Sequence, residues 1–367
     1  MDRRYLLLEN GRVFEGQAFG AQGGCIGEVV FTTNMTGYTE TLTDPSYEGQ
    51  IVTQTFPLMG NYGVNPADFE SRRPFVKGYI VKEQCQAPSH FACGGTLDGF
   101  LRQYGIPGLC GIDTRALTKL IRTAGVLRGA LVDEEPFAKN KEQLLDELHS
   151  FRIGCAVRRV SVGEPARYPV ESPKRKVLLW DFGVKDSSVR RLNDRGCDVT
   201  VIPAEWTAER IMAERPDGIL LSNGPGDPEE NQDIIAEIRK LLAQDIAIFG
   251  ICLGHQLLAL ANGGGTAKLK YGHRGGNHPV RDLLTGRTYI TSQNHGYAVQ
   301  LGDQLPGNAS PRYLNANDGT CEGLDYSGFR GFSVQFHPEA CGGPKDTEFL
   351  FDRFVALMDE RRDAQCR

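Results

Sequence analysis

A cysteine in a predicted tight turn is the residue of this sequence best placed for nucleophilic chemistry. Cys252 lies in Gly-Ile-Cys-Leu-Gly-His-Gln, residues 250–256, after an apolar run that predicts a strand and before a pattern that predicts a helix. Glycines two positions before and after it remove side chains that would clash in so tight a turn. The positive potential of a helix N-terminus favours thiolate over thiol. We therefore predict that Cys252 is a nucleophile.

A thiol nucleophile needs a general base, and His337 is the best candidate among the seven histidines. It ends a predicted strand in the segment Phe-His-Pro-Glu, and Pro338 favours extended backbone at the residue before it. His337 and Glu339 then lie on the same side of the chain, so Glu339 can accept a hydrogen bond from the imidazole and fix its tautomer. Cys252, His337 and Glu339 form a candidate catalytic triad.

A glycine-rich segment supplies a second candidate piece of the site. Ser-Asn-Gly-Pro-Gly-Asp-Pro, residues 222–228, follows a predicted strand and should lie at the same carboxyl edge of the sheet as Cys252. We expect the backbone N–H groups of Leu253 and Gly224 to form an oxyanion hole. The glycine pattern is not a dinucleotide fingerprint, because no third glycine opens a helix.

Each segment alone also has an ordinary structural explanation. The ten cysteines are scattered without a Cys-x-x-Cys pair, which is typical of small buried hydrophobic residues in a reducing compartment. The spacing of Cys252 and His255 would permit a metal, but no second pair completes a zinc site, so we predict no metal. His255 is better explained as a helix-start residue. Three such segments in this order on one scaffold favour catalysis.

The second half of the chain predicts an α/β fold in which strands and helices alternate. Its strands are expected at residues 177–180, 199–202, 218–221 and 246–249. Its helices are expected at residues 185–195, 208–214, 233–242, 255–261 and 347–360. Strands that are apolar on both faces indicate a mainly parallel sheet flanked by helices.

The first half reads as a mixed β/α domain with Gly, Asn and Pro turns. Strands are expected at residues 27–33, 50–56 and 76–82, and helices at 97–104, 113–125 and 141–149. Residues 152–174 have the Pro- and Arg-containing composition of a linker. We predict a first domain at 1–151, this linker, and a second domain at 175–367.

Composition excludes several classes of function. The 367 residues carry a net charge of −5 without a strongly basic stretch, so no nucleic-acid partner is expected. The N-terminal apolar run is too short for a signal peptide, and no segment reaches the length of a membrane span, so we expect a cytoplasmic protein without membrane contact. No Gly-x-x-x-x-Gly-Lys-[Ser/Thr] loop is present to hold ATP.

The three candidate site segments resemble those of class I glutamine amidotransferases, which remove ammonia from glutamine. Segments of the first half resemble the N-terminal domain of carbamoyl phosphate synthetase small chains, and two segments of the second half do so as well. They are residues 34–38, 42–47, 50–53, 60–63, 111–115, 275–280 and 292–299. The resemblance runs nearly end to end, so the second domain is expected to have the class I glutamine amidotransferase fold.

The resemblance implies which residues hold L-glutamine. They are Ser46, Gly224, Gly226, Leu253, Gln256, Asn294, Gly296 and Tyr297. Neutral donors and acceptors of this kind suit an amide and an α-amino acid. Ser46 would reach over from the first domain, and Tyr297 stands where Phe is more frequent. Cys341 is either buried filler, which we favour, or a second accessible thiol.

The resemblance also implies the partner and the pathway. The chain would be the glutaminase subunit of a carbamoyl phosphate synthetase, without a cofactor of its own. A large subunit would use ATP, Mg and bicarbonate to make carbamoyl phosphate for pyrimidine biosynthesis, arginine biosynthesis or both. Three alternatives stay open: a glutaminase subunit of another biosynthetic enzyme, a cysteine hydrolase that cuts peptides or esters, and a non-catalytic scaffold subunit with a relic site.

Overall fold

The computed structural model describes residues 2–134, 141–339 and 342–365, so Cys341 lies outside the described residues. The chain forms two compact units, Met1–Ile153 and Gly154–Arg367. Within the described part, no helix has both the length and the apolar character that crossing a membrane requires.

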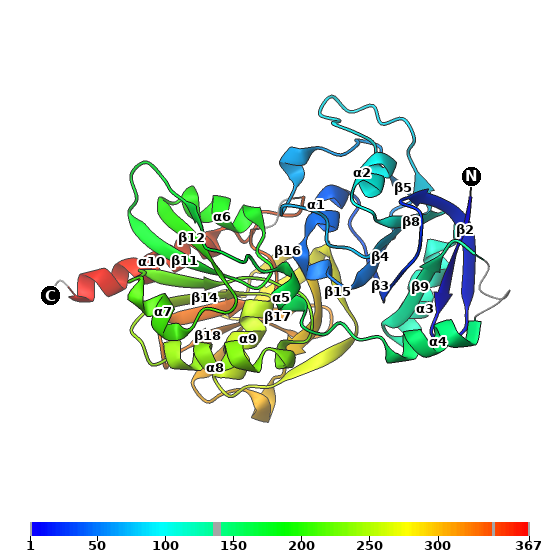
Figure 1. Ribbon diagram of the computed structural model, residues 1–367. Helices are drawn as coiled ribbons and strands as arrows, with labels where there is room; N and C mark the ends of the chain where they lie inside the picture. Colours follow the sequence, from blue (N-terminus) through cyan, green and yellow to red (C-terminus); the bar gives the residue numbers. More distant parts are fainter. Residues whose placement is uncertain (1, 135–140, 340–341, 366–367) are drawn as a thin grey trace. The chain divides into compact units, whose positions relative to one another are not determined.

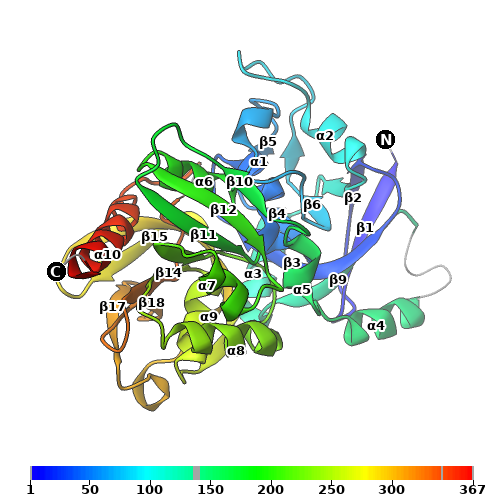
Figure 2. The ribbon, with the colours of Figure 1, turned by 60° about the vertical axis from the view of Figure 1, so that its left-hand side comes forward.

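The first unit is built on a closed barrel of strands (Figures 1 and 2). In the order β1-β2-β8-β6-β4-β3-β9, its strands are Arg3–Leu8, Val13–Gly20, Pro107–Cys110, Gly78–Ile80, Gln50–Gln54, Cys25–Thr32 and Leu127–Val132. The barrel closes because β1 pairs with β9 as well as with β2. The sequence predicted β3, β4 and β6 but not the closure, since apolar runs identify strands without identifying their neighbours.

The expected helices of the first unit are present. They are α2 (Leu97–Gln103), α3 (Thr114–Ala124) and α4 (Lys141–Ser150), and the unit also contains α1 (Tyr38–Thr43). The Asp113 side chain caps α3 by accepting from the N–H of Ala116 at 2.9 Å, and Gly125 ends it at a φ of +99°. Short elements complete the unit: η1 (Pro45–Tyr47), η2 (Pro66–Asp68), β5 (Leu58–Met59) and β7 (Glu83–Gln84).

The second unit contains a ten-stranded sheet in the order β10-β12-β11-β13-β14-β19-β18-β17-β15-β16. Its parallel part consists of β12 (Cys197–Pro203), β11 (Arg175–Asp181), β13 (Gly218–Leu221), β14 (Ala247–Ile251) and β19 (Gly331–Val334). Its antiparallel part consists of β18 (Cys321–Tyr326), β17 (Ala309–Asn315), β15 (Thr266–Asp282) and β16 (Thr288–Val299). The tenth strand, β10 (Ala166–Tyr168), pairs antiparallel with β12 at the opposite edge. The α/β class is thus confirmed, and the sheet is mixed: the pairs from β12 to β19 are parallel and the others are antiparallel.

Helices cover both faces of the parallel part (Figure 1). Leu178 and Trp180 of β11 pack in one core with α7 (Ala208–Ala213), α8 (Gln232–Leu241) and α9 (Leu253–Ala261). Their neighbours Val177 and Leu179 pack in the other core with α6 (Asp186–Asn193) and α10 (Phe349–Gln365). Successive side chains of a strand point to opposite faces, which explains why the apolar runs are continuous.

The segment 152–174, expected to be a linker, is largely part of the second unit. It contains α5 (Ala156–Val160), whose Val157 is buried in a core of that unit, and β10 (Ala166–Tyr168), which pairs with β12. The Pro- and Arg-containing composition hid both elements, because they are too short to show periodicity. Contacts with the rest of the unit order them.

Candidate active site

Cys252 occupies the turn between β14 and α9. Its φ is +53°, in a region that residues other than glycine rarely adopt. A Cβ at position 250 would lie 2.7 Å from the carbonyl oxygen of Gly254, and one at position 254 would collide with the carbonyl oxygen of Leu221. The predicted strand–turn–helix is confirmed, and the geometry explains why glycine stands on both sides of the cysteine.

His337 and Glu339 form a buried hydrogen-bonded pair just beyond β19. Nδ1 of His337 donates to Oε1 of Glu339 at 2.6 Å, and both side chains are almost wholly buried. Burial and Lys185 oppose the charge on the imidazole, but Glu339 and Cys252 outweigh them and raise the pKa of His337 to about 10. Burial also opposes the charge on Glu339, yet His337 and Lys185 lower its pKa to about 2. The pair is therefore ionic at neutral pH.

The Cys252 thiol is near enough to the imidazole to contribute to the raised pKa of His337. Because Nδ1 of His337 faces Glu339, Nε2 is the ring atom left for the thiol, and it has no hydrogen-bond partner of standard geometry among the described residues. Sγ of Cys252 itself donates to the carbonyl oxygen of Asn294 at 3.6 Å. The structure brings together the three residues that the sequence proposed as a triad.

Lys185 is a site residue that sequence reasoning missed. Its ammonium lies 3.2 Å from Nδ1 of His337 and 3.3 Å from Oε1 of Glu339, and its side chain is 10% exposed. It lies immediately before α6, at the carboxyl edge of the sheet where β11 ends. A single lysine after a predicted strand gives no sequence signal of such a position.

The two proposed oxyanion donors are neighbours. Leu253 is the first residue of α9, so its N–H is not used within the helix. A Cβ on Gly224 would lie 2.8 Å from Cδ2 of Leu253 and would collide with the carbonyl oxygen of Phe182. Position 224 therefore excludes a side chain, which leaves its backbone accessible to a ligand.

Two of the proposed glutamine-binding residues, Gln256 and Asn294, are hydrogen-bonded to Cys252. Asn294, Gly296 and Tyr297 all belong to β16, and the amide of Gln256 donates to the carbonyl oxygen of Tyr297 at 2.8 Å. The same amide donates to Oε1 of Gln335 at 2.9 Å, and Gln335 is a buried residue that the sequence did not single out. These bonds join α9, β16 and the segment before His337.

Two further expected residues have only local contacts to report. Gly226 has a φ of +90° in the loop after β13. Ser46 lies in η1 of the first unit, where its N–H is capped by the Asp44 side chain at 2.9 Å. Their roles in binding stay predictions.

The surroundings of His255 are those of a buried histidine in the protein core. It is fully buried, its Nδ1 lies 2.8 Å from Oγ of Ser333, and burial lowers its pKa to about 3. Among the described residues, the one group with metal-ligand geometry does not include Cys252 or His255.

A strained cysteine between a strand and a helix, beside a histidine–glutamate pair at the parallel part of the sheet, defines a class I glutamine amidotransferase domain. Residues 178–357 match the family model described as "Glutamine amidotransferase class-I". Residues 6–131 match the model described as "Carbamoyl-phosphate synthase small chain, CPSase domain". The chain belongs to the carbamoyl phosphate synthase small chain family, as its similarity to individual relatives also shows.

Three relatives illustrate this similarity over the whole length. The chain is 52% identical to the carbamoyl phosphate synthase small chain of Clostridium perfringens, over 95% of this chain and 98% of the relative. It is 50% identical to that of Listeria monocytogenes, over 100% and 99%. It is 49% identical to the pyrimidine-specific small chain of Bacillus subtilis, over 97% and 96%.

Proposed function

We propose that this chain hydrolyses L-glutamine at Cys252 and supplies the ammonia for carbamoyl phosphate synthesis. The observation that carries the proposal is the ionic His337–Glu339 pair, buried beside a cysteine in a strained strand–helix turn. Such a pair orients and charges the imidazole that a thiol nucleophile needs.

The reaction proceeds through a thioester. The Cys252 thiolate attacks the side-chain carbonyl carbon of glutamine, and the N–H groups of Leu253 and Gly224 stabilise the oxyanion. The imidazolium of His337, held by Glu339, gives its proton to the leaving nitrogen, and ammonia departs. His337 then takes a proton from water, whose oxygen attacks the thioester carbon. The C–S bond breaks, glutamate is released and the Cys252 thiolate is regenerated.

Glutamine recognition is assigned to eight residues by resemblance. Ser46, Gln256 and Asn294 offer polar side chains, and backbone groups complete the set. The backbone groups belong to Gly224, Gly226, Leu253, Gly296 and Tyr297. The hydrogen bonds from Gln256 to Tyr297 and from Cys252 to Asn294 support the part of this set that lies around the nucleophile.

We further propose that a large carbamoyl phosphate synthetase subunit is the partner and that it uses ATP, Mg and bicarbonate. This chain then needs no cofactor. The match of residues 6–131 to the small-chain domain favours this partner over other enzymes that take ammonia from glutamine. The name of the Bacillus subtilis relative assigns that protein to pyrimidine synthesis, and we propose pyrimidine biosynthesis, arginine biosynthesis or both for this chain. A cytoplasmic location also stays a prediction.

The substitution Cys252→Ala tests the assignment. Glutamine hydrolysis should fall about a thousand-fold or more, because loss of the nucleophile removes the thioester route. The assembled enzyme should still make carbamoyl phosphate from added ammonium, which is the control for folding and assembly. Retained glutamine hydrolysis would overturn the proposal.

Assays of the native chain separate the remaining alternatives. Peptide and ester substrates should be hydrolysed far more slowly than glutamine, and the reverse result would indicate a general cysteine hydrolase. A reactive glutamine analogue should label Cys252 covalently, and failure to label it would favour a non-catalytic scaffold.

A further inference from the structure

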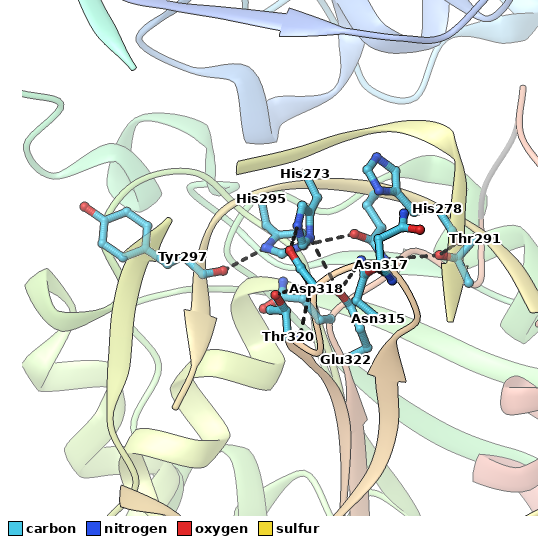
Figure 3. Close-up of polar contacts among 12 residues, drawn as sticks. His273, His278, Thr291, His295, Tyr297, Asn315, Asn317, Asp318, Thr320 and Glu322 are labelled. Atoms are coloured by element: carbon cyan, nitrogen blue, oxygen red, sulfur yellow. Dashed lines mark hydrogen bonds and ion pairs between the residues drawn. The ribbon is translucent and has the colours of Figure 1, made fainter. Parts of the chain in front are cut away.

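Two histidines and a glutamate gather in the antiparallel part of the second unit and take no part in the proposed mechanism. His273 of β15, His295 of β16 and Glu322 of β18 are all buried, and one potential ligand atom of each lies within 4.8 Å of the other two (Figure 3). His273 and His295 are direct cross-strand partners, and their rings stand nearly perpendicular with centroids 4.9 Å apart. The group thus joins three strands.

Each imidazole is oriented from outside the group. Nε2 of His273 lies 2.8 Å from Oδ2 of Asp318, and Nδ1 of His295 lies 2.8 Å from the carbonyl oxygen of Tyr297. A carbonyl oxygen only accepts, so Nδ1 of His295 carries the proton and the lone pair of the neutral ring is on Nε2. Metal-binding histidines are oriented in this way, by donating the other ring N–H to a carboxylate or a backbone carbonyl.

Two contacts inside the group bring acceptors against acceptors, although Oε1 of Glu322 also accepts from Nδ2 of Asn315 at 3.3 Å. When Nε2 of His273 donates to Asp318, the lone pair on Nδ1 faces Oε1 of Glu322 at 3.5 Å. Nε2 of His295 lies 3.2 Å from Oε1 of Gln293. Within the described chain, Nδ1 of His273 and Oε2 of Glu322 have no hydrogen-bond partner. Buried acceptors without donors are costly, and a cation among them removes that cost.

We propose that His273, His295 and Glu322 bind a divalent transition-metal ion of the zinc type. Two imidazoles and one carboxylate suit zinc, whereas calcium and magnesium prefer oxygen ligands alone. Oε1 of Gln293 or a water completes the coordination. The ion ties β15, β16 and β18 together, and it fixes the segment of β16 that contains Asn294 and Tyr297. No step of glutamine hydrolysis requires it.

The competing explanation of the same geometry is a protonated His273. An imidazolium would donate to Asp318 from Nε2 and to Glu322 from Nδ1, and the group would then have no use for a metal. The two explanations differ in metal uptake, which can be measured without glutamine. Failure of the metal proposal therefore leaves the glutaminase proposal intact.

The experiment is a titration of the full-length, metal-stripped chain with Co²⁺ and Zn²⁺. The Cys252→Ala background removes the thiol beside His337 as a second place for the metal. We expect one ion per chain, with visible d–d bands and no thiolate charge-transfer band. His273→Gln and Glu322→Gln should weaken binding at least about ten-fold, and Asp318→Asn should weaken it about 10–100-fold.

The control variant is His149→Gln, which removes a histidine of the first unit and should leave the affinity unchanged. Thermal unfolding in metal-free buffer shows whether each variant folds. Zinc should raise the unfolding temperature of the parent and not that of His273→Gln. Asp318→Asn changes a half-exposed side chain and so keeps the test valid where a buried substitution prevents folding. Absence of saturable binding, or parental affinity in a folded His273→Gln or Asp318→Asn variant, would overturn the proposal.

Discussion

Lys185 adds a third charge to the His337–Glu339 pair. Its ammonium helps to keep Glu339 ionised and at the same time opposes protonation of His337. A positive charge about 3 Å from both groups therefore balances the pair, which would otherwise hold the proton still more tightly. We infer that Lys185 is a positioning residue. It limits the rise in the pKa of His337 and thereby sets the pH at which the imidazole gives up its proton.

The substitution Lys185→Met tests this role through the pH dependence of glutamine hydrolysis. Removal of the ammonium should raise the pKa of His337 further, so the alkaline limb of kcat/KM should move to higher pH. We expect kcat to fall about ten-fold, as is typical when one charged partner of a buried group is lost. Lys185→Arg, which keeps the charge, should restore the limb toward its original position. A purely structural role would reduce the amount of folded protein without moving the limb.

At the scale of elements, the turn between β14 and α9 allows no side chain beside the nucleophile. Gly254→Ala would place a Cβ against the backbone of β13, which cannot move as a flexible side chain can. We expect the substitution to reduce the free energy of unfolding by about 3 kcal/mol and to abolish glutamine hydrolysis. Urea unfolding and a glutaminase assay measure the two effects.

Gly307→Ala is the matched control for that substitution. An added Cβ at position 307 would meet no atom within 4 Å, and the same change of residue should leave both measurements nearly unaltered. Equal effects of the two substitutions would mean that the loss at position 254 does not come from crowding in the turn.

The elements that the sequence predicted are those whose pattern is local. Continuous apolar runs identified β11, β13 and β14, and a spacing of two along an extended chain paired His337 with Glu339. The β15–β16 hairpin escaped prediction, because β15 is rich in glycine, histidine and charged residues rather than apolar ones. Lys185 and Gln335 escaped for another reason: their importance comes from contacts with distant segments, which one sequence does not encode locally.

At the scale of the whole molecule, the small-chain family implies a second polypeptide. We predict that the chain, expressed in its own host and purified through a tag, brings down a much larger ATP-using protein. The complex should form carbamoyl phosphate from glutamine, ATP and bicarbonate, whereas the chain alone should release only glutamate and ammonia. Copurification with a different ammonia-using enzyme would contradict this prediction and would assign the chain to another biosynthetic pathway.

The closed barrel of the first unit restricts how such a partner can be bound. Every barrel strand has a neighbour on both sides, so among the described residues the barrel has no edge strand that lacks a partner along its whole length. Recognition by an added strand, which is common where a sheet has a free edge, is thereby disfavoured at the barrel. Whatever protein docks there must be selected by outward side chains and connecting loops, the parts of a barrel that can change without disturbing its closure.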